Sequence, residues 1–127
     1  MTIGLWHTLT FTDADAGLAW LRAVGFTEQA CYRDEADPSV VHHAELLWPG
    51  GGGVMCGSHR PNPDWPTQPG CAAAYLVTDD VDAVVTAAVA AGAVTLRAPR
   101  EEEYGGRGAT VRDPEGNLWS FGTYAPA

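Results

Sequence analysis

Residues 11–26, FTDADAGLAWLRAVGF, align without a gap on residues 78–93, TDDVDAVVTAAVAAGA. Asp13 falls on Asp80, and the offset stays constant along the whole alignment. Self-similarity at a fixed spacing indicates a duplicated structural unit, and this decides how the rest of the chain is interpreted. We therefore divide the chain into two similar halves.

Each copy carries the signals of one short helix. An Asp stands where its side chain can cap the free N–H groups of the first turn, and a Gly stands where the chain leaves the helix. In the second copy the apolar residues recur at helical spacing and share one face: Val81, Val84, Val85, Ala88 and Val89. We expect that face to pack on a sheet.

Strand-like runs surround both helices. One run precedes each helix, at residues 5–12 and 72–78. Three runs rich in β-formers follow each helix, at residues 26–32, 40–47 and 53–58 and at residues 94–98, 108–112 and 117–124. Both halves therefore predict the order βαβββ. The predicted class is α+β, with two modules forming a cupped, mainly antiparallel sheet.

A Pro-rich stretch without periodicity, HRPNPDWPTQPG at residues 59–70, is interpreted as a linker that can also act as a lid. We predict a single domain over residues 1–127, with module one at residues 1–60 and module two at residues 71–127. A half of this size would be marginally stable alone, so the two modules should pack into one unit.

Composition limits the classes of function. The 127 residues carry a net charge of −9, which repels nucleic acid and anionic membranes. The negative charge has two interpretations: it attracts a cationic ligand, or it only keeps the protein soluble. The three cysteines lack CxxC spacing, which argues against a disulfide framework and a structural zinc site. No apolar run reaches the roughly 20 residues of a membrane helix, and the N-terminus lacks signal-peptide features, so we expect a cytoplasmic protein.

The closing stretch, residues 104–124 (YGGRGATVRDPEGNLWSFGTY), places a strong turn between two strand-like runs. Pro114 presets φ in this turn and Gly116 takes a positive φ. Together with the duplication and the first helix, the stretch resembles the glyoxalase/bleomycin resistance protein/dioxygenase family, the vicinal oxygen chelate superfamily, over nearly the whole chain. The resemblance implies a homodimer and, for its drug-binding members, antibiotic resistance.

The resemblance also provides a test for a metal centre. In the metal-using members, four ligands point into the cup from the first and last strands of each half. The corresponding positions here are Trp6, Met55, Ala73 and Ser120. None of these side chains is a good ligand for a divalent cation at neutral pH. We therefore expect no metal and no other cofactor.

An aromatic and hydroxylated cup would hold its ligand by stacking. The predicted ligand-binding residues are Trp6, Thr8, Trp48, Met55, Trp65, Tyr75, Tyr104, Arg107 and Ser120. For the predicted ligand-binding residues that lie in loops, a purely structural role is the alternative. The tryptophans at 48 and 65 would instead seal a core edge or a dimer contact, and the loop around Tyr104 and Arg107 would be only a solvated connection.

A histidine and a carboxylate offer a different chemistry. His43 and Glu45 lie two apart on one predicted strand and share a face, where they could bind a metal or act as base and acid. They are the candidate catalytic residues, and the alternative is a polar pair that faces solvent or a dimer partner. His7 should face the helix together with Leu9 and Phe11.

The favoured hypothesis is a metal-independent protein that sequesters an aromatic or cationic small molecule such as an antibiotic. The first alternative is an enzyme of the same fold, a lyase, isomerase or dioxygenase, with a non-standard metal or acid-base site at His43 and Glu45. The second is a regulatory or accessory domain whose cup is vestigial. Either one chain or a dimer can supply the cup.

Overall fold

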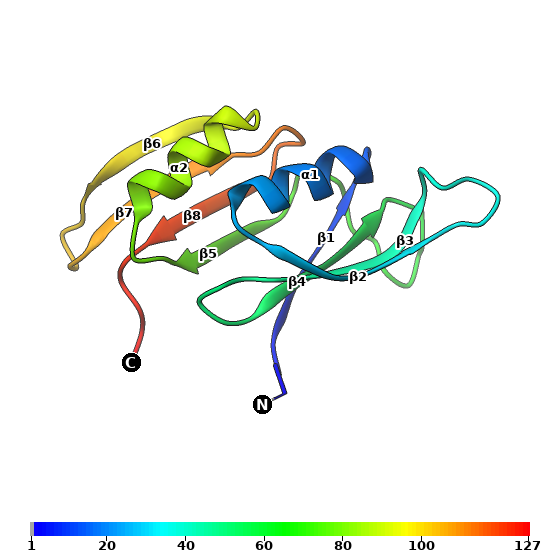
Figure 1. Cartoon of the computed structure of the whole chain (residues 1–127), viewed down its shortest axis with the longest axis horizontal. Coiled ribbons are helices and arrows are strands. Elements are labelled where there is room, and N and C mark those ends of the chain that lie inside the picture. The colour runs from blue at the N-terminus through cyan, green and yellow to red at the C-terminus, as the bar shows by residue number, and fades with distance from the viewer. Residues whose placement is uncertain (1) are drawn as a thin grey trace.

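The computed structural model describes residues 2–127 and folds them into two βαβββ modules (Figure 1). The first module contains β1 (Trp6–Phe11), α1 (Ala14–Val24), β2 (Thr27–Arg33), β3 (Val41–Leu47) and β4 (Gly53–Ser58). The second module contains β5 (Ala73–Val77), α2 (Val81–Ala90), β6 (Val94–Glu101), β7 (Arg107–Arg112) and β8 (Leu118–Gly122). The predicted α+β class and the element order of both modules are confirmed.

Each module builds its own 4-stranded sheet, in the orders β1-β4-β3-β2 and β5-β8-β7-β6. The first and last strands of a module run parallel, and the other neighbours run antiparallel. The two ladders correspond, because Thr8 pairs with Met55 in the first sheet as Tyr75 pairs with Ser120 in the second. Met55 is therefore the first-module counterpart of Ser120, as the resemblance implied.

Both helices begin at the predicted aspartates. Asp13 Oδ1 accepts a hydrogen bond from the Ala16 amide at 3.1 Å, and Asp80 Oδ1 accepts one from the Ala83 amide at 3.1 Å. A side-chain cap of this kind stabilises a helix by about 1 kcal/mol. Helix α1 ends at Gly25, whose φ of 133° suits a residue without a Cβ atom. Neither helix of the described chain is long and apolar enough to cross a membrane.

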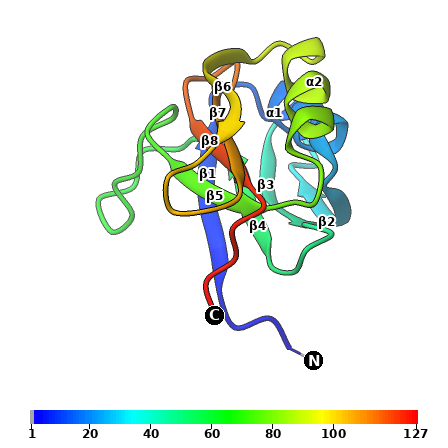
Figure 2. The ribbon, with the colours of Figure 1, turned by 90° about the vertical axis from the view of Figure 1, so that its left-hand side faces the viewer.

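The two helices lie on the same side of the sheets and contact each other (Figure 1, Figure 2). The Trp20 indole N–H of α1 donates to the Ala88 carbonyl of α2 at 3.1 Å. Trp20 and Trp119 are 2% and 1% exposed, with ring centroids 5.6 Å apart, so both belong to the core. Val89 departs from the predicted buried stripe, because α2 buries a narrower face that includes Val81 and Ala88.

The turn at residues 113–116 fastens the second module to the first. The Glu115 carboxylate accepts hydrogen bonds from the backbone N–H groups of Thr12 and Asp13, at 2.6 and 2.7 Å, where the chain enters α1. A negative charge is favourable there because the first turn of a helix leaves N–H groups free and carries a partial positive charge. The turn thus connects the two halves of the chain as well as two strands.

Strand β6 extends beyond the predicted run, which ended at residue 98. It continues to Glu101, and Arg100 pairs with Gly108 on β7. Pro99 is tolerated because β6 is an edge strand whose ladder shifts register between Arg97 and Arg100.

Candidate ligand-binding groove

The alternation of side chains along β1 separates a buried face from an open one. Leu9 and Phe11 point towards the helices and are 5% and 1% exposed, whereas Thr8 is exposed on the opposite face. We call the side of each sheet that is turned away from the helices its open face. His7 lies on the helix side, as predicted, and its ring centroid is 5.6 Å from that of Trp119.

A groove of about 480 Å³ lies between the open face of the first module and the linker. Thr8, His43 and Met55 line it from β1, β3 and β4. The linker contributes Trp65, whose side chain is 55% exposed. Figure 2 shows the linker, in green between β4 and β5, projecting from the side of the sheets opposite the helices. The structure therefore brings these predicted site residues together.

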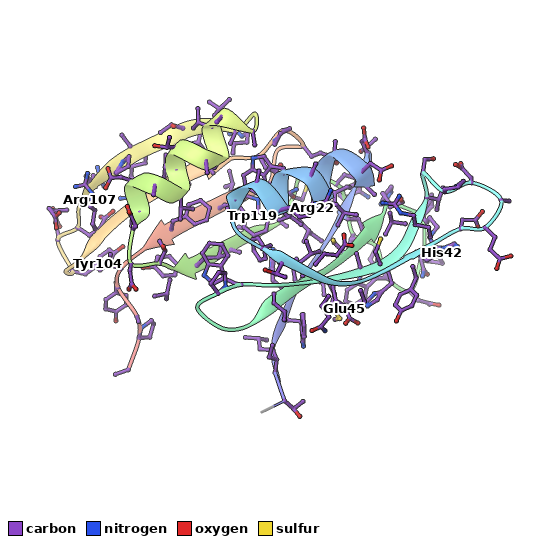
Figure 3. All side chains as sticks on the ribbon, in the orientation of Figure 1. Arg22, His42, Glu45, Tyr104, Arg107 and Trp119 are labelled. Atoms are coloured by element: carbon purple, nitrogen blue, oxygen red, sulfur yellow. The ribbon has the colours of Figure 1, made fainter. Side chains whose placement is uncertain are left out.

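His43 and Glu45 form a hydrogen-bonded pair on this open face, as their spacing predicted. His43 Nε2 and Glu45 Oε2 are 2.8 Å apart, and Glu45 Oε1 accepts a hydrogen bond from the Gln29 side-chain amide at 2.8 Å. The hydrogen bond from Gln29, followed by that with His43, lowers the pKa of Glu45, so the carboxylate is ionised at neutral pH. Tyr32 stacks on the His43 ring, with centroids 6.3 Å apart. Figure 3 shows Glu45 on the side of the strands away from α1.

In the second module, Tyr75 fills the equivalent open face. Its ring lies across Gly122 of β8, where an added Cβ atom would overlap with the Tyr75 hydroxyl. That hydroxyl donates to the Tyr124 carbonyl at 2.8 Å. On the same face the Ser120 and Thr110 hydroxyls are hydrogen-bonded at 2.9 Å. The polar groups of Tyr75 and Ser120 therefore already have partners within the protein.

Tyrosine side chains border a second, shallow hollow of about 450 Å³ on this face, formed by Tyr75, Tyr104 and Tyr124 together with Pro126. The Tyr104 and Tyr124 rings meet edge to face with centroids 5.3 Å apart. Tyr75 and Tyr104, both predicted ligand-binding residues, thus lie together in the second module, apart from the groove.

Arg107 lies away from the open faces. Its Nε and Nη2 atoms donate to the two carboxylate oxygens of Asp82 on α2, at 2.7 and 3.0 Å. This bidentate pair raises the pKa of Arg107 above its ordinary value. Alternation along β7 places Gly108 on the open face, beneath Glu102, and therefore turns Arg107 towards the helix. The structure therefore turns Arg107, one of the predicted ligand-binding residues, away from the open faces.

Trp48 belongs to the junction of the modules rather than to the groove. Its indole N–H donates to the Val77 carbonyl of β5 at 2.8 Å, and its ring packs 5.0 Å from that of Phe26. Its structural alternative, the sealing of a core edge, therefore describes it better than a wall of the groove. Trp6 also has a packing role, because its ring lies over Gly53 at the start of β4.

The residues at the family's metal-ligand positions do not fit a metal ion. These positions, Trp6, Met55, Ala73 and Ser120, offer no imidazole, thiolate or carboxylate. Within the part of the chain that the structure describes, no three His, Cys, Asp or Glu side chains gather closely enough to hold an ion. The pair of His43 and Glu45 lacks a third protein ligand of that kind.

Sequence reasoning missed several residues that surround the candidate sites. Gln29 and Tyr32 reach Glu45 and His43 from β2, whose ladder with β3 shifts register twice. A simple alternation rule therefore does not reveal which side chains of β2 meet those of β3. Tyr124 lies beyond the end of β8, and only the fold brings it to Tyr75.

Comparison with known proteins agrees with this architecture. A family model described as the glyoxalase At5g48480-like C-terminal domain matches residues 73–122. The crystal structure of TioX from Micromonospora sp. ML1 is 30% identical, with a TM-score of 0.72, and the match covers 96% of this chain and 100% of TioX. A search of curated protein sequences finds no match.

Two further structures share the fold at lower identity. A glyoxalase/bleomycin resistance protein from Streptomyces sp. CB03234 is 21% identical, with a TM-score of 0.64 over 91% of this chain and 95% of that one. A member of the glyoxalase/bleomycin resistance protein/dioxygenase superfamily from Sphaerobacter thermophilus DSM 20745 is 19% identical, with a TM-score of 0.60 over 96% and 98%. The chain belongs to this superfamily, as the resemblance in its sequence indicated.

Proposed function

We propose that this protein is a cytoplasmic binder of a planar aromatic small molecule, preferably a cationic one such as an antibiotic, which it sequesters in the groove without a metal. The observation that carries the proposal is the exposed Trp65 indole beside about 480 Å³ of open volume. Small-molecule sites are commonly clefts of roughly 300–1,000 Å³ with aromatic walls and a few polar groups. Capture alone would perform the function.

The walls of the groove suit such a ligand. Trp65 offers a ring face for stacking, and an aromatic contact contributes about 0.5–1.5 kcal/mol beyond the area that it buries. Thr8 and His43 add hydrogen-bonding groups. The net charge of −9 attracts cations from a distance. Arg60 also lines the groove, so the preference for a cation requires its own test.

Isothermal titration of EDTA-treated protein with proflavine, a planar tricyclic cation, tests the proposal. We expect stoichiometric binding that does not change when Zn²⁺, Ni²⁺, Mn²⁺ or Fe²⁺ is added. Acridine-9-carboxylate, an anion with the same ring system, separates the contribution of charge from that of stacking. Failure of both compounds to bind, or binding only after metal is added, would contradict the proposal. Sedimentation velocity of the same sample tests the expected homodimer.

A second candidate function rests on the 2.8 Å hydrogen bond between His43 and Glu45. An ionised carboxylate holds an imidazole in one orientation, which suits acid-base catalysis of an isomerase or lyase reaction on the bound molecule. His43→Ala distinguishes the two functions. A binder keeps most of its affinity for proflavine in this variant, whereas an enzyme converts its substrate only in the parent protein.

A further inference from the structure

A separate cavity of about 250 Å³ lies between the two modules, and we call it the junction cavity. The first module contributes His7, Phe26 and Trp48 to its walls, and the second contributes Ala74 and Trp119. The hydrogen bond from the Trp48 indole to the Val77 carbonyl, 2.8 Å long, ties the two walls together. In Figure 1 the turn between β3 and β4, which carries this tryptophan, extends towards β5.

Aromatic rings form a continuous wall of this cavity. The ring centroid of Phe26 lies 5.0 Å from that of Trp48 and 6.0 Å from that of Trp119, and the His7 ring lies 5.6 Å from Trp119. Apart from Tyr75, the other lining residues are small or aliphatic, including Ala74 and the glycines at residues 50–53. Among the described residues, no Asp, Glu, Lys or Arg lines the cavity. This lining favours an uncharged aromatic ligand, because burial of a charge without a partner is unfavourable.

His7 introduces unused hydrogen-bonding capacity into this apolar lining. Its buried Nε2 atom has no hydrogen-bond partner among the described residues. Burial also lowers the pKa of His7, so the ring is neutral at pH 7 and combines one donor nitrogen with one acceptor nitrogen. Buried polar atoms of folded proteins are normally paired, so a ligand that meets a ring nitrogen of His7 would supply a partner that the protein itself does not provide.

The volume limits the size of that partner. An engineered apolar cavity of about 150 Å³ in another protein holds benzene. The junction cavity, at about 250 Å³, has room for a fused two-ring aromatic molecule. Gly51 and Gly52 form part of the cavity margin, and both have a positive φ and open space where a Cβ atom would lie.

We propose that the junction cavity is a second ligand site, which takes a small uncharged aromatic molecule whose single N–H or O–H group hydrogen-bonds to His7. The occupant differs in size and charge from the ligand proposed for the groove. Because both modules contribute walls, a bound molecule also holds the modules together and raises the melting temperature of the whole chain.

Indole and benzofuran are the probes, since they have nearly the same shape but only indole has an N–H group. Both are titrated into ¹⁵N-labelled protein, and the indole N–H signals of the five tryptophans are followed. We expect the Trp48 and Trp119 signals to shift and the Trp65 signal to stay. We also expect indole to bind about 2- to 10-fold more tightly than benzofuran, the difference that one hydrogen bond contributes.

A matched pair of variants tests the location. Ala74→Leu fills the cavity from β5 and should abolish the shifts caused by indole. Ala73→Leu adds the same atoms to the neighbouring residue, which is exposed on the other face of the strand, and should leave them unchanged. His7→Phe keeps a ring against Trp119 but removes both nitrogens, so indole should then bind no more tightly than benzofuran.

Three outcomes would overturn the proposal: no shift of Trp48 or Trp119 at millimolar indole in the parent protein, a shift of Trp65 alone, or equal binding of both probes with no effect of His7→Phe. Loss of folding in Ala74→Leu leaves the test intact, because the parent protein and His7→Phe still decide it. Proflavine binding in the groove is measured in a separate experiment, so the proposal for one site can be contradicted while the proposal for the other is supported.

Discussion

The two modules share a fold and a strand register, but their open faces differ. In the first module Thr8 stands opposite Met55 and leaves room for the groove. In the second module Tyr75 stands at the position of Thr8 and lies across β8 over Gly122. The two open faces are therefore equivalent in strand register. The size of one side chain, Thr8 or Tyr75, separates the face with the groove from the filled face.

This comparison explains where a ligand is expected. Glycine occupies corresponding positions in the two modules, because Gly57 pairs with Thr10 as Gly122 pairs with Val77. In the second module the tyrosine ring lies above its glycine, whereas in the first module the backbone of residues 41–42 lies closest above Gly57 and Thr8 lines the groove beside it. Exchange of the two residues at positions 8 and 75 is therefore the most direct way to test the comparison.

Thr8→Tyr should have the largest effect. Thr8 lines the groove, so the larger ring would take up groove volume, and we expect proflavine affinity to fall by about 100-fold or more through direct overlap. Thr8→Val is the matched control, since it changes the hydroxyl and keeps the size. Unchanged affinity in Thr8→Tyr would show that the ligand binds elsewhere, and the comparison between the faces would fail.

Trp65→Ala should weaken binding by about 10-fold, because it removes the exposed ring from the groove and with it the stacking contact. Tyr104→Ala removes an aromatic ring of similar exposure from the loop of the second module. Titration of both variants with proflavine compares the two faces directly. A larger loss in Tyr104→Ala would move the site to the tyrosine hollow.

Tyr75→Thr tests the filled face. The variant loses the hydrogen bond to the Tyr124 carbonyl, and we expect the free energy of unfolding to fall by about 1 kcal/mol, measured by urea denaturation. Proflavine should then show a second, weaker binding event, because the space above Gly122 opens. If the stoichiometry stays the same, then factors other than ring size keep the second face from binding.

Glu45→Gln should produce the smallest effect, and it depends on pH. The pKa of Glu45 is lowered from its ordinary value of 4.5 by Gln29 first and then by His43, so the ionised carboxylate stabilises the folded state at neutral pH. That stabilisation is lost as the pH falls below 4.5 and through the lowered pKa. The parent protein should therefore have a higher melting temperature than the Glu45→Gln variant at pH 7, and the difference between the two temperatures should become smaller in acid.

Glu103→Gln is the control for this pH series, because it neutralises an exposed carboxylate in the second module. Its melting temperature should differ from that of the parent protein by the same amount at every pH in the series. A gap for Glu45→Gln that grows in acid would contradict the lowered pKa.

Much of the fold could be predicted because its signals are local. The helix caps at Asp13 and Asp80, the turn at residues 113–116 and the alternation along β1 depend on neighbours in the chain. The same rules predicted that His43 and Glu45 would share a face, since they are two residues apart on one strand. These features follow from backbone geometry and do not require knowledge of distant contacts.

Differences from the predicted site arose for side chains whose hydrogen-bond partners lie far away in the sequence. Arg107 was expected at the cup, but Asp82 on α2 offers its guanidinium a bidentate carboxylate on the other face. For Trp48 the sequence left a ligand wall and a core edge as alternatives, and the structure places it at the module junction, where the Val77 carbonyl accepts its indole N–H. No local pattern reports such partners.

The sequence by itself determined the duplicated βαβββ order, the superfamily and the lack of ligating side chains at the family's metal positions, because each depends on residue types at fixed spacings. Only the tertiary structure decided which open face has room, since that depends on how the Tyr75 ring lies over Gly122. It alone also revealed the junction cavity, because His7 and Trp119 come from opposite ends of the chain and meet only when the modules pack.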